Sequence, residues 1–321
     1  MLDFGHEKQW LFLKKSASLG KLSHAYLFSG KPKLGKRKIA LEFAKLLNCQ
    51  DRDFGKKPCQ KCSSCLETEK NCHPDFLLLE TKEKTEESEI DSIRFLIDWF
   101  SLKPGLGRYR IAVIDQFQNF SLPAQSALLK TLEEPRGNAI LILVCDYPEF
   151  LSSTIVSRLQ EIKFHSLSFK ETTDFLVSRG TKEALASRAS LFSLGRPLKA
   201  LELLEKENLE AEEEKLESFT NLLTESLSSW FRQIEKMAEN KDYLAETLET
   251  WLSFLRLLFL KKIGSLDQDF IEGKAFFHKG DSLALAKLKN FLSSLERANY
   301  LLLRTNANAR LILENSILEL F

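Results

Sequence analysis

Short runs of almost continuously apolar residues recur through the first half of the chain. Such runs suit strands that are buried on both faces of a parallel sheet. They are AYLFSG at 25–30, DFLLLE at 75–80, RIAVID at 110–115 and AILILVCD at 139–146. The more polar segment EIKFHSL at 161–167 is interpreted as a further strand. Helical patterns lie between them, including KRKIALEFAKLL and SLPAQSALLKTLEEP, the latter with Ser121 as N-cap, Pro123 in its first turn and Pro135 as its end. The alternation predicts an α/β nucleotide-binding core with a parallel sheet.

The composition changes once along the chain. All eight prolines lie at or before Pro197, all six cysteines lie at or before Cys145, and the rest has apolar residues at helical spacing. We therefore predict three parts: a nucleotide-fold domain at 1–166, a small helical domain at 167–206 and an all-α domain at 207–321. The acidic run EKENLEAEEEKLE near the last boundary is interpreted as a solvated helix face or a linker.

The segment GKPKLGKRK almost matches a phosphate-binding loop, G-x-x-x-x-G-K-[ST]. Gly30, Gly35 and Lys36 occupy the expected positions, so the loop geometry and one positive charge are retained. Arg37 stands where a hydroxyl would ligate magnesium, and a guanidinium has no acceptor atom. The loop is therefore predicted to attract an anion but to position Mg²⁺ poorly.

A second loss occurs in IAVIDQFQNF, which resembles the acidic strand that helps to hold Mg²⁺ in nucleotide-hydrolysing folds. Asp115 supplies the first acid, but the next position, where a glutamate would activate water, is Gln116. A neutral amide is no general base. The two losses predict a nucleotide fold without its hydrolytic chemistry. Whether the loop still holds ATP is left open by the sequence.

Four cysteines, Cys49, Cys59, Cys62 and Cys65, have the spacing C-x9-C-x2-C-x2-C. Four thiolates that converge on one ion complete a tetrahedral zinc site without an open position, which is typical of a structural role. Disulfides and redox cysteines are the alternatives, and a reducing compartment argues against the first. Cys72 is interpreted as a free thiol. Cys145, which lies on an apolar strand, is interpreted as a core residue.

Arg158 lies in SSTIVSRLQEIKF, between a short helix and the next strand. An exposed arginine at a domain edge can reach the γ-phosphate of a neighbouring subunit. From the residues alone, a structural ion pair with a nearby carboxylate such as Glu161 is the simpler interpretation. His24 and His73 stand beside strands without a nucleophile motif, and we expect structural roles for both.

The net charge of +1 gives no global field that favours nucleic acid or a membrane. The N-terminal sequence MLDFGHEKQW lacks the basic and apolar regions of a signal peptide. The apolar run WLSFLRLLFL is too short to span a bilayer and contains Arg256. These features predict a soluble cytoplasmic protein.

Taken together, the motifs resemble the clamp-loader family of bacterial AAA+ proteins, which serves DNA polymerase III. The resemblance covers nearly the whole chain. It rests on LSHAYLFSGKPKLGKRKIALEFAKLLNC, the four cysteines followed by HPDF, IDSIRFLIDWFSLKPGLGRYRIAVID, ALLKTLEEP, TIVSRLQ, LGRPLKALEL and NANARLILENSILEL. It implies an AAA+ core with an inserted zinc module, a small lid domain and a helical collar that builds a pentameric ring. In this family the ring loads a sliding clamp onto primed DNA.

The resemblance also implies roles for single residues. Ser157 and Arg158 match the family's S-R-C motif, whose arginine acts in trans on a neighbouring ATPase subunit, with Leu159 in place of the cysteine. Arg196 in LGRP lies near the second sensor position of the family. A zinc module combined with a broken ATP site indicates a non-hydrolysing subunit. Two rival functions remain, an ATP-hydrolysing AAA+ motor and a zinc-dependent nucleic-acid-binding module.

Overall fold

The structure is a computed structural model that describes residues 5–80, 85–135, 137–205, 208–223, 225–264, 283–305 and 307–320. Internal contacts divide the chain into two compact units, Met1–Leu201 and Glu202–Phe321. The further separation of the first unit into a nucleotide-fold domain and a lid stays a prediction. Each unit is described by itself below.

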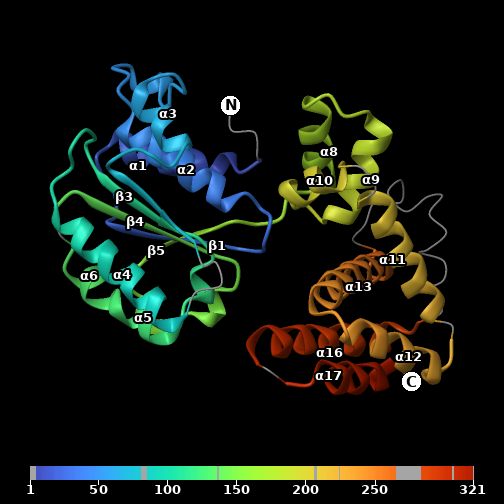
Figure 1. The fold of residues 1–321 in the computed structure, drawn as a ribbon. Coiled ribbons are helices and arrows are strands. Elements are labelled where there is room, and N and C mark those ends of the chain that lie inside the picture. The colour runs from blue at the N-terminus through green and yellow to red at the C-terminus, as the bar shows by residue number, and fades with distance from the viewer. Residues whose placement is uncertain are drawn as a thin grey trace. The chain divides into compact units, whose positions relative to one another are not determined.

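A five-stranded parallel sheet forms the centre of the first unit (Figure 1). The strand order is β2-β3-β4-β1-β5. The strands are β1 (Ala25–Ser29), β2 (Phe76–Leu79), β3 (Arg110–Ile114), β4 (Ala139–Cys145) and β5 (Gln160–Lys163). Every residue of β1 and β3 is buried, as expected for strands that are covered on both faces. Each segment interpreted as a strand thus corresponds to one strand, and the predicted parallel sheet is confirmed.

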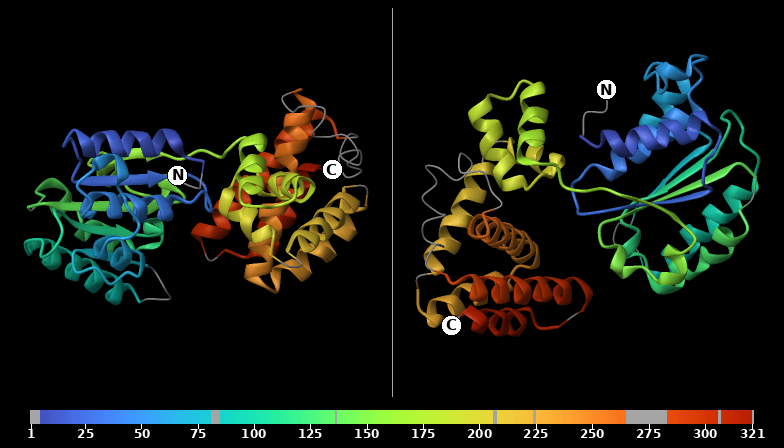
Figure 2. Two further views of the ribbon diagram at one scale, coloured as in Figure 1. Left: turned by 90° about the horizontal axis from the view of Figure 1, so that it is seen from above. Right: turned by 180° about the vertical axis from the view of Figure 1, so that it is seen from behind.

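Helices cover both faces of this sheet (Figures 1 and 2). Tyr26 and Phe28 of β1 pack into a core with Phe43 of the helix that follows the glycine loop. The alternate residue Leu27 packs on the opposite face with Phe117. The helices on the two faces are α1 (Glu7–Ser18) and α2 (Lys36–Asn48), and α4 (Glu86–Ser101), α5 (Leu122–Ala127), α6 (Leu129–Glu133) and α7 (Ser153–Val156). The strand period of two therefore builds two separate cores around one sheet.

The segment SLPAQSALLKTLEEP differs from its prediction in two ways. It forms two short helices, α5 and α6, because the N–H of Leu128 bonds to the carbonyl of Gln125, three residues back, and tightens the turn. Ser121 stands at the N-cap, but its side chain makes no capping hydrogen bond. The N–H of Ser121 instead donates to the carboxylate of Glu89 on α4. The boundaries near Pro123 and Pro135 agree with the sequence.

The first unit also carries the cysteine segment and a small group of helices. These elements are η1 (Phe54–Lys56), α3 (Ser63–Glu69), η2 (Phe117–Asn119), η3 (Pro148–Phe150), α8 (Phe169–Ser178), α9 (Glu183–Ser193) and most of α10 (Pro197–Leu203), which ends two residues beyond Leu201. Helix α8 begins with a capping box in which Ser168 and Glu171 satisfy each other's backbone N–H groups. The N–H of Leu198 on α10 donates to the carbonyl of Lys33 in the glycine loop, 3.1 Å away.

The described part of the second unit is helical, as predicted. Its elements are α11 (Asn208–Leu222), α12 (Leu227–Ala238), α13 (Lys241–Lys262), α16 (Leu285–Arg304), α17 (Ala309–Ile317) and η4 (Leu318–Leu320). Phe219 stacks on Trp251 at a centroid distance of 4.8 Å, and Trp230 meets both rings edge-on. This aromatic cluster joins three helices into one core. Across the described segments of the chain, no helix is both long enough and apolar enough to cross a membrane.

Candidate functional site

The glycine loop joins β1 to α2 in the geometry that the sequence predicted. Gly30 and Gly35 have φ values of 141° and 92°, a region that side chains rarely enter. A Cβ atom on Gly30 would lie 2.3 Å from the backbone oxygen of Phe164. Glycine is therefore required at Gly30 both by the backbone conformation and by the approach of the chain after β5.

Lys36, the first residue of α2, is buried and fully engaged by its own chain. Its Nζ atom lies 2.6 Å from Oδ1 of Asp146, which follows β4, and it donates to the backbone oxygens of Gly30 and Lys31. Only 3% of the side chain of Lys36 and 14% of that of Asp146 is exposed. The charge of Lys36 is thus already compensated within the chain. Sequence analysis missed Asp146, although its place at the carboxyl end of a strand beside β1 was a usable signal.

Arg37 forms ion pairs with two acids at the same end of the sheet. Its Nη1 atom lies 3.3 Å from Oδ2 of Asp115 after β3, and Nη2 contacts Glu80 after β2. Burial raises the pKa of Asp115, and the nearby guanidinium only partly opposes this effect. The carboxylate of Asp115 is therefore paired with a side-chain cation of the same chain. Glu80 was the second participant that sequence analysis missed.

Gln116 stands directly after Asp115 and has an exposed side chain. Its Oε1 atom accepts a hydrogen bond of 3.2 Å from Asn119, and its N–H donates to Asp115. The backbone at Gln116 is left-handed, with φ at 49°. The side chain that occupies this position is a neutral amide engaged in a local turn, and it cannot take a proton from water.

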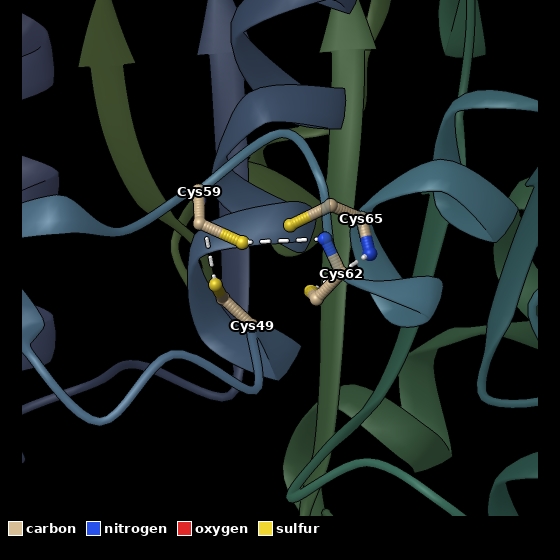
Figure 3. Close-up of side chains that lie close together, drawn as sticks. All are labelled: Cys49, Cys59, Cys62 and Cys65. Atoms are coloured by element: carbon tan, nitrogen blue, oxygen red, sulfur yellow. Dashed lines mark hydrogen bonds between the residues drawn. The ribbon is translucent and has the colours of Figure 1, made fainter.

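The four cysteines of the predicted metal site come together at the end of α2 and the start of α3 (Figure 3). Their sulfur atoms all lie within 4.8 Å of one another, and Cys49 and Cys65 are buried. The sulfur atoms of a tetrahedral site with metal–sulfur bonds of about 2.3 Å are about 3.8 Å apart. The four side chains are therefore positioned to hold one metal ion after a small contraction.

Backbone N–H groups support this cluster. The N–H of Cys59 lies 3.4 Å from the sulfur of Cys49, and the N–H of Cys62 lies 3.4 Å from the sulfur of Cys59. A hydrogen bond from the N–H of Lys61 lowers the pKa of Cys59 to about 6, whereas burial raises the pKa of Cys65. Donors directed at sulfur favour the thiolate, which is the form that ligates metals.

The other two cysteines and the histidines His24 and His73 lie outside the four-cysteine cluster. Cys72 is exposed and lies outside the four-cysteine cluster, whereas Cys145 is buried in the core around β4. His24 Nε2 lies 3.0 Å from the carbonyl oxygen of Leu132. His73 is buried, and its Nδ1 atom accepts from the N–H of Asp75. The burial of Cys145 agrees with the core position expected from the sequence, and the interpretations of Cys72, His24 and His73 stay predictions.

Arg158 follows α7 and is partly exposed, with 32% of its side chain accessible. Its ion-pair partner is Glu133 at the end of α6, with Nε 2.9 Å from Oε1, and not Glu161 as the sequence suggested. Glu161 lies on β5 and accepts a hydrogen bond of 2.7 Å from Ser29. None of the described contacts of Arg158 reaches the glycine loop. Arg196, near the expected sensor position, is buried and donates to the carbonyl of Ser193.

A buried acid that sequence analysis did not assign organises the loop before β3. Asp75 is fully buried, and its carboxylate accepts the N–H groups of Gly105, Leu106 and Gly107 at 2.7–2.8 Å. Burial alone would raise the pKa of Asp75, but these donors and Arg110 outweigh it and hold the pKa below its ordinary value. The HPDF motif thus joins the cysteine segment to the loop before β3.

The chain is similar to known replication proteins. The profile of the family described as "DNA polymerase III, delta subunit" matches residues 5–168. DNA polymerase III subunit gamma of Buchnera aphidicola subsp. Schizaphis graminum is 36% identical over 159 residues, 50% of this chain and 43% of the relative. DNA polymerase III subunit delta' of Bacillus subtilis is 33% identical over 175 residues, 54% of this chain and 52% of the relative.

A solved structure also aligns with the chain. A gamma-subunit-related protein of Thermotoga maritima matches with a TM-score of 0.48 and 19% identity over 97% of both chains. The chain spans about half or less of the length of the curated relatives it matches.

Proposed function

The chain belongs to the DNA polymerase III delta-subunit family, and from this membership we propose that it is the delta-prime (δ′) subunit of a clamp loader. In this role it does not hydrolyse ATP itself. It contributes to a ring that loads a sliding clamp onto primed DNA during replication. The observation that carries the proposal is the pair of internal ion pairs at the glycine loop, Lys36 with Asp146 and Arg37 with Asp115.

The degenerate nucleotide site is proposed from the charges at this loop. Asp146 forms an ion pair with Lys36, the residue that would bind the β- and γ-phosphates of a nucleotide. A bound nucleotide would have to displace Asp146 from this lysine. Arg37 neutralises Asp115 and has no acceptor atom for Mg²⁺. A neutral Gln116 follows, so no carboxylate at that position activates water. The chain thus keeps four residues of an ATP site, Gly30, Gly35, Lys36 and Asp115. It lacks the hydroxyl that would ligate Mg²⁺ and the carboxylate that would activate water for hydrolysis.

Zinc is the metal that we propose for the four cysteines. A set of four thiolates suits Zn²⁺, and a site filled by four protein ligands leaves no position for a substrate. Cys49, Cys59, Cys62 and Cys65 would therefore bind it for structure, tying the end of α2 to α3. Lys57 donates to the carbonyl of Cys49 and brings positive charge close to a cluster whose formal charge would be negative.

Arg158, together with Ser157 of the same motif, is proposed to act in trans. Its guanidinium is partly exposed, so a phosphate carried by a neighbouring subunit can reach it. Such an arginine stabilises the negative charge that develops on the transferred phosphoryl group and contributes several orders of magnitude in rate. The neighbours expected from the family are ATPase subunits of the gamma or tau type and a delta-type subunit in a heteropentamer, with the sliding clamp and primer–template DNA as partners of the complex.

The test is the ATPase rate of a reconstituted loader that contains the wild-type chain or Arg158→Ala, with DNA and clamp present. We expect the variant to lower the stimulated rate at least about tenfold while the complex assembles normally. Arg94→Ala is the matched control, because Arg94 is an exposed arginine on α4 in a local pair with Asp91. An unchanged rate with Arg158→Ala would leave this chain a structural subunit.

The similarity to gamma and tau subunits favours a second candidate function, an ATP-hydrolysing motor subunit. Magnesium-dependent turnover of ATP by the isolated chain separates the two candidates. We expect no turnover above that of a Lys36→Ala control. Turnover that disappears in this control would favour the motor.

A further inference from the structure

The guanidinium of Arg158 is bonded on three sides within its own chain. Nε and Nη2 lie 2.9 and 2.5 Å from the same oxygen of Glu133. Nη1 donates to the backbone oxygen of Thr154 at 2.7 Å and to Oγ of Ser157 at 3.4 Å. The planar guanidinium can donate two parallel hydrogen bonds to one phosphate. To accept both bonds, a phosphate from a neighbouring subunit must displace at least one of the present partners of Arg158.

The fold, and not the flexibility of one long side chain, brings these partners together. Glu133 is the last residue of α6, and Arg158 comes two residues after α7, a helix that packs on α6. The last carbonyls of a helix lack partners within the helix, and Nη1 of Arg158 satisfies that of Thr154. The arginine thus closes α7, and Glu133 fixes the direction of the guanidinium.

We propose that Glu133 restrains Arg158 in an internal ion pair that is exchanged for the phosphate of a neighbouring subunit only when the complex is stimulated. This inference rests on the proposed role of Arg158 in trans. Glu133 is a positioning residue, since it acts through Arg158 and touches no substrate. Its function would be to keep the neighbour's hydrolysis slow before DNA and clamp are bound.

The charges and exposures of the pair favour this exchange. Glu133 is 51% and Arg158 32% exposed at the side chain, so the ion pair is weak enough to break during each cycle. If Glu133 stayed bound to Arg158, its negative carboxylate would lie beside the negative phosphate, and the two charges would repel each other. A phosphate group carries more charge than a carboxylate and accepts the same planar fork. The phosphate therefore replaces Glu133 once it comes within reach.

The experiment compares loaders that contain Glu133→Gln with the wild type, without and with DNA and clamp. The variant keeps the shape and an acceptor oxygen but removes the charge. We expect the unstimulated ATPase rate to rise about two- to fivefold and the stimulated rate to change less than about twofold. Glu134→Gln is the matched control, because Glu134 is the adjacent exposed acid of the same segment and should change neither rate.

A general structural defect would lower both rates, whereas release of a restraint raises only the unstimulated one. In the double variant Glu133→Gln/Arg158→Ala the increase should disappear. An unstimulated rate that stays at or below the wild-type value overturns the proposed restraint, provided that Arg158→Ala still lowers the stimulated rate. If Arg158→Ala leaves the stimulated rate unchanged, the proposed role in trans fails and the restraint fails with it, so the two failures are distinguishable.

A second readout uses the isolated chain. The exchange of the Arg158 Nε–H with water, followed by ¹⁵N NMR, should become severalfold faster in Glu133→Gln, because this N–H donates to Glu133. Equal exchange in the two proteins would show that the ion pair does not restrain the arginine, and it would overturn the proposal without reference to any ATPase.

Discussion

The Nζ atom of Lys36 lies 2.6 Å from Oδ1 of Asp146, and both side chains are largely buried. The lysine of the glycine loop is therefore held by a carboxylate from the end of β4. Removing the charge of Asp146 leaves a buried ammonium with two carbonyl oxygens as its main partners. We expect Asp146→Asn to lower the free energy of unfolding by about 2–4 kcal/mol.

Urea unfolding measures this loss, and Asp98→Asn, at an exposed acid on α4, is the control. If Asp146→Asn unfolds at the wild-type midpoint, the loop carbonyls alone satisfy Lys36. The ion pair with Asp146 would then contribute nothing to the stability of the fold.

Cys59→Ser should release the metal and destabilise the first unit. Cys59 lies in the cluster with sulfur atoms within 4.8 Å of one another, and serine is a poor ligand for a soft site. Because metal binding and local folding are coupled, we expect loss of bound zinc and a fall in stability of about 3 kcal/mol or more. Elemental analysis and thermal unfolding test this.

Cys72→Ser is the matched control for this variant, because Cys72 is exposed and lies outside the cluster. It should keep full metal content and full stability. A Cys59→Ser protein as stable as the wild type, in a preparation where neither contains metal, would contradict the zinc proposal.

Asp75→Asn should destabilise the protein in a pH-dependent way. The folded state holds the pKa of Asp75 below its unfolded value, so its carboxylate stabilises the fold above the unfolded pKa, about 3.9. This stabilisation is lost as the pH falls through the folded pKa. At pH 7 we expect the variant to be less stable by about 2–3 kcal/mol, because three backbone N–H groups lose a charged, buried acceptor.

The measurement is the unfolding free energy of wild type and Asp75→Asn from pH 7 down to the lowest pH at which both stay folded. The difference should be constant near neutrality and shrink in acid. A difference that does not change with pH would mean that the loss comes from shape and not from the charge of Asp75.

Gly195→Ala should be much more harmful than Gly180→Ala. Both glycines have positive φ, 72° and 89°, so the conformational strain of an added Cβ atom is similar. At Gly195 that atom would lie 2.0 Å from the backbone oxygen of Leu167, whereas nothing lies within 4 Å at Gly180. We expect Gly195→Ala to cost about 2 kcal/mol more, because the added atom overlaps a backbone oxygen and such overpacking costs about 1–3 kcal/mol.

Thermal or urea unfolding of the two alanine variants gives this difference directly. Equal losses would show that the backbone near Leu167 moves aside freely. The contact between Gly195 and Leu167, whose N–H donates to the Gly195 carbonyl at 2.8 Å, would then not fix the start of α8.

Much of the first unit could be predicted because its signals are local. Four apolar runs and the segment at 161–167 became five strands, the glycines at 30 and 35 adopted positive φ values, and four cysteines gathered in one cluster. Each signal lies within a few residues or repeats at a short spacing. The helix at 121–135 was predicted less well, because the tight turn at Leu128 leaves no mark in composition.

The charge partners could not be predicted from the sequence. Lys36 pairs with Asp146, 110 residues away, Arg37 pairs with Asp115, 78 residues away, and Arg158 pairs with Glu133 and not with Glu161. The sequence determined which side chains carry charge and which segments form strands. Only the parallel sheet, which brings the carboxyl ends of distant strands to one edge, decided which charges meet, because electrostatic pairing depends on distance in space and not along the chain.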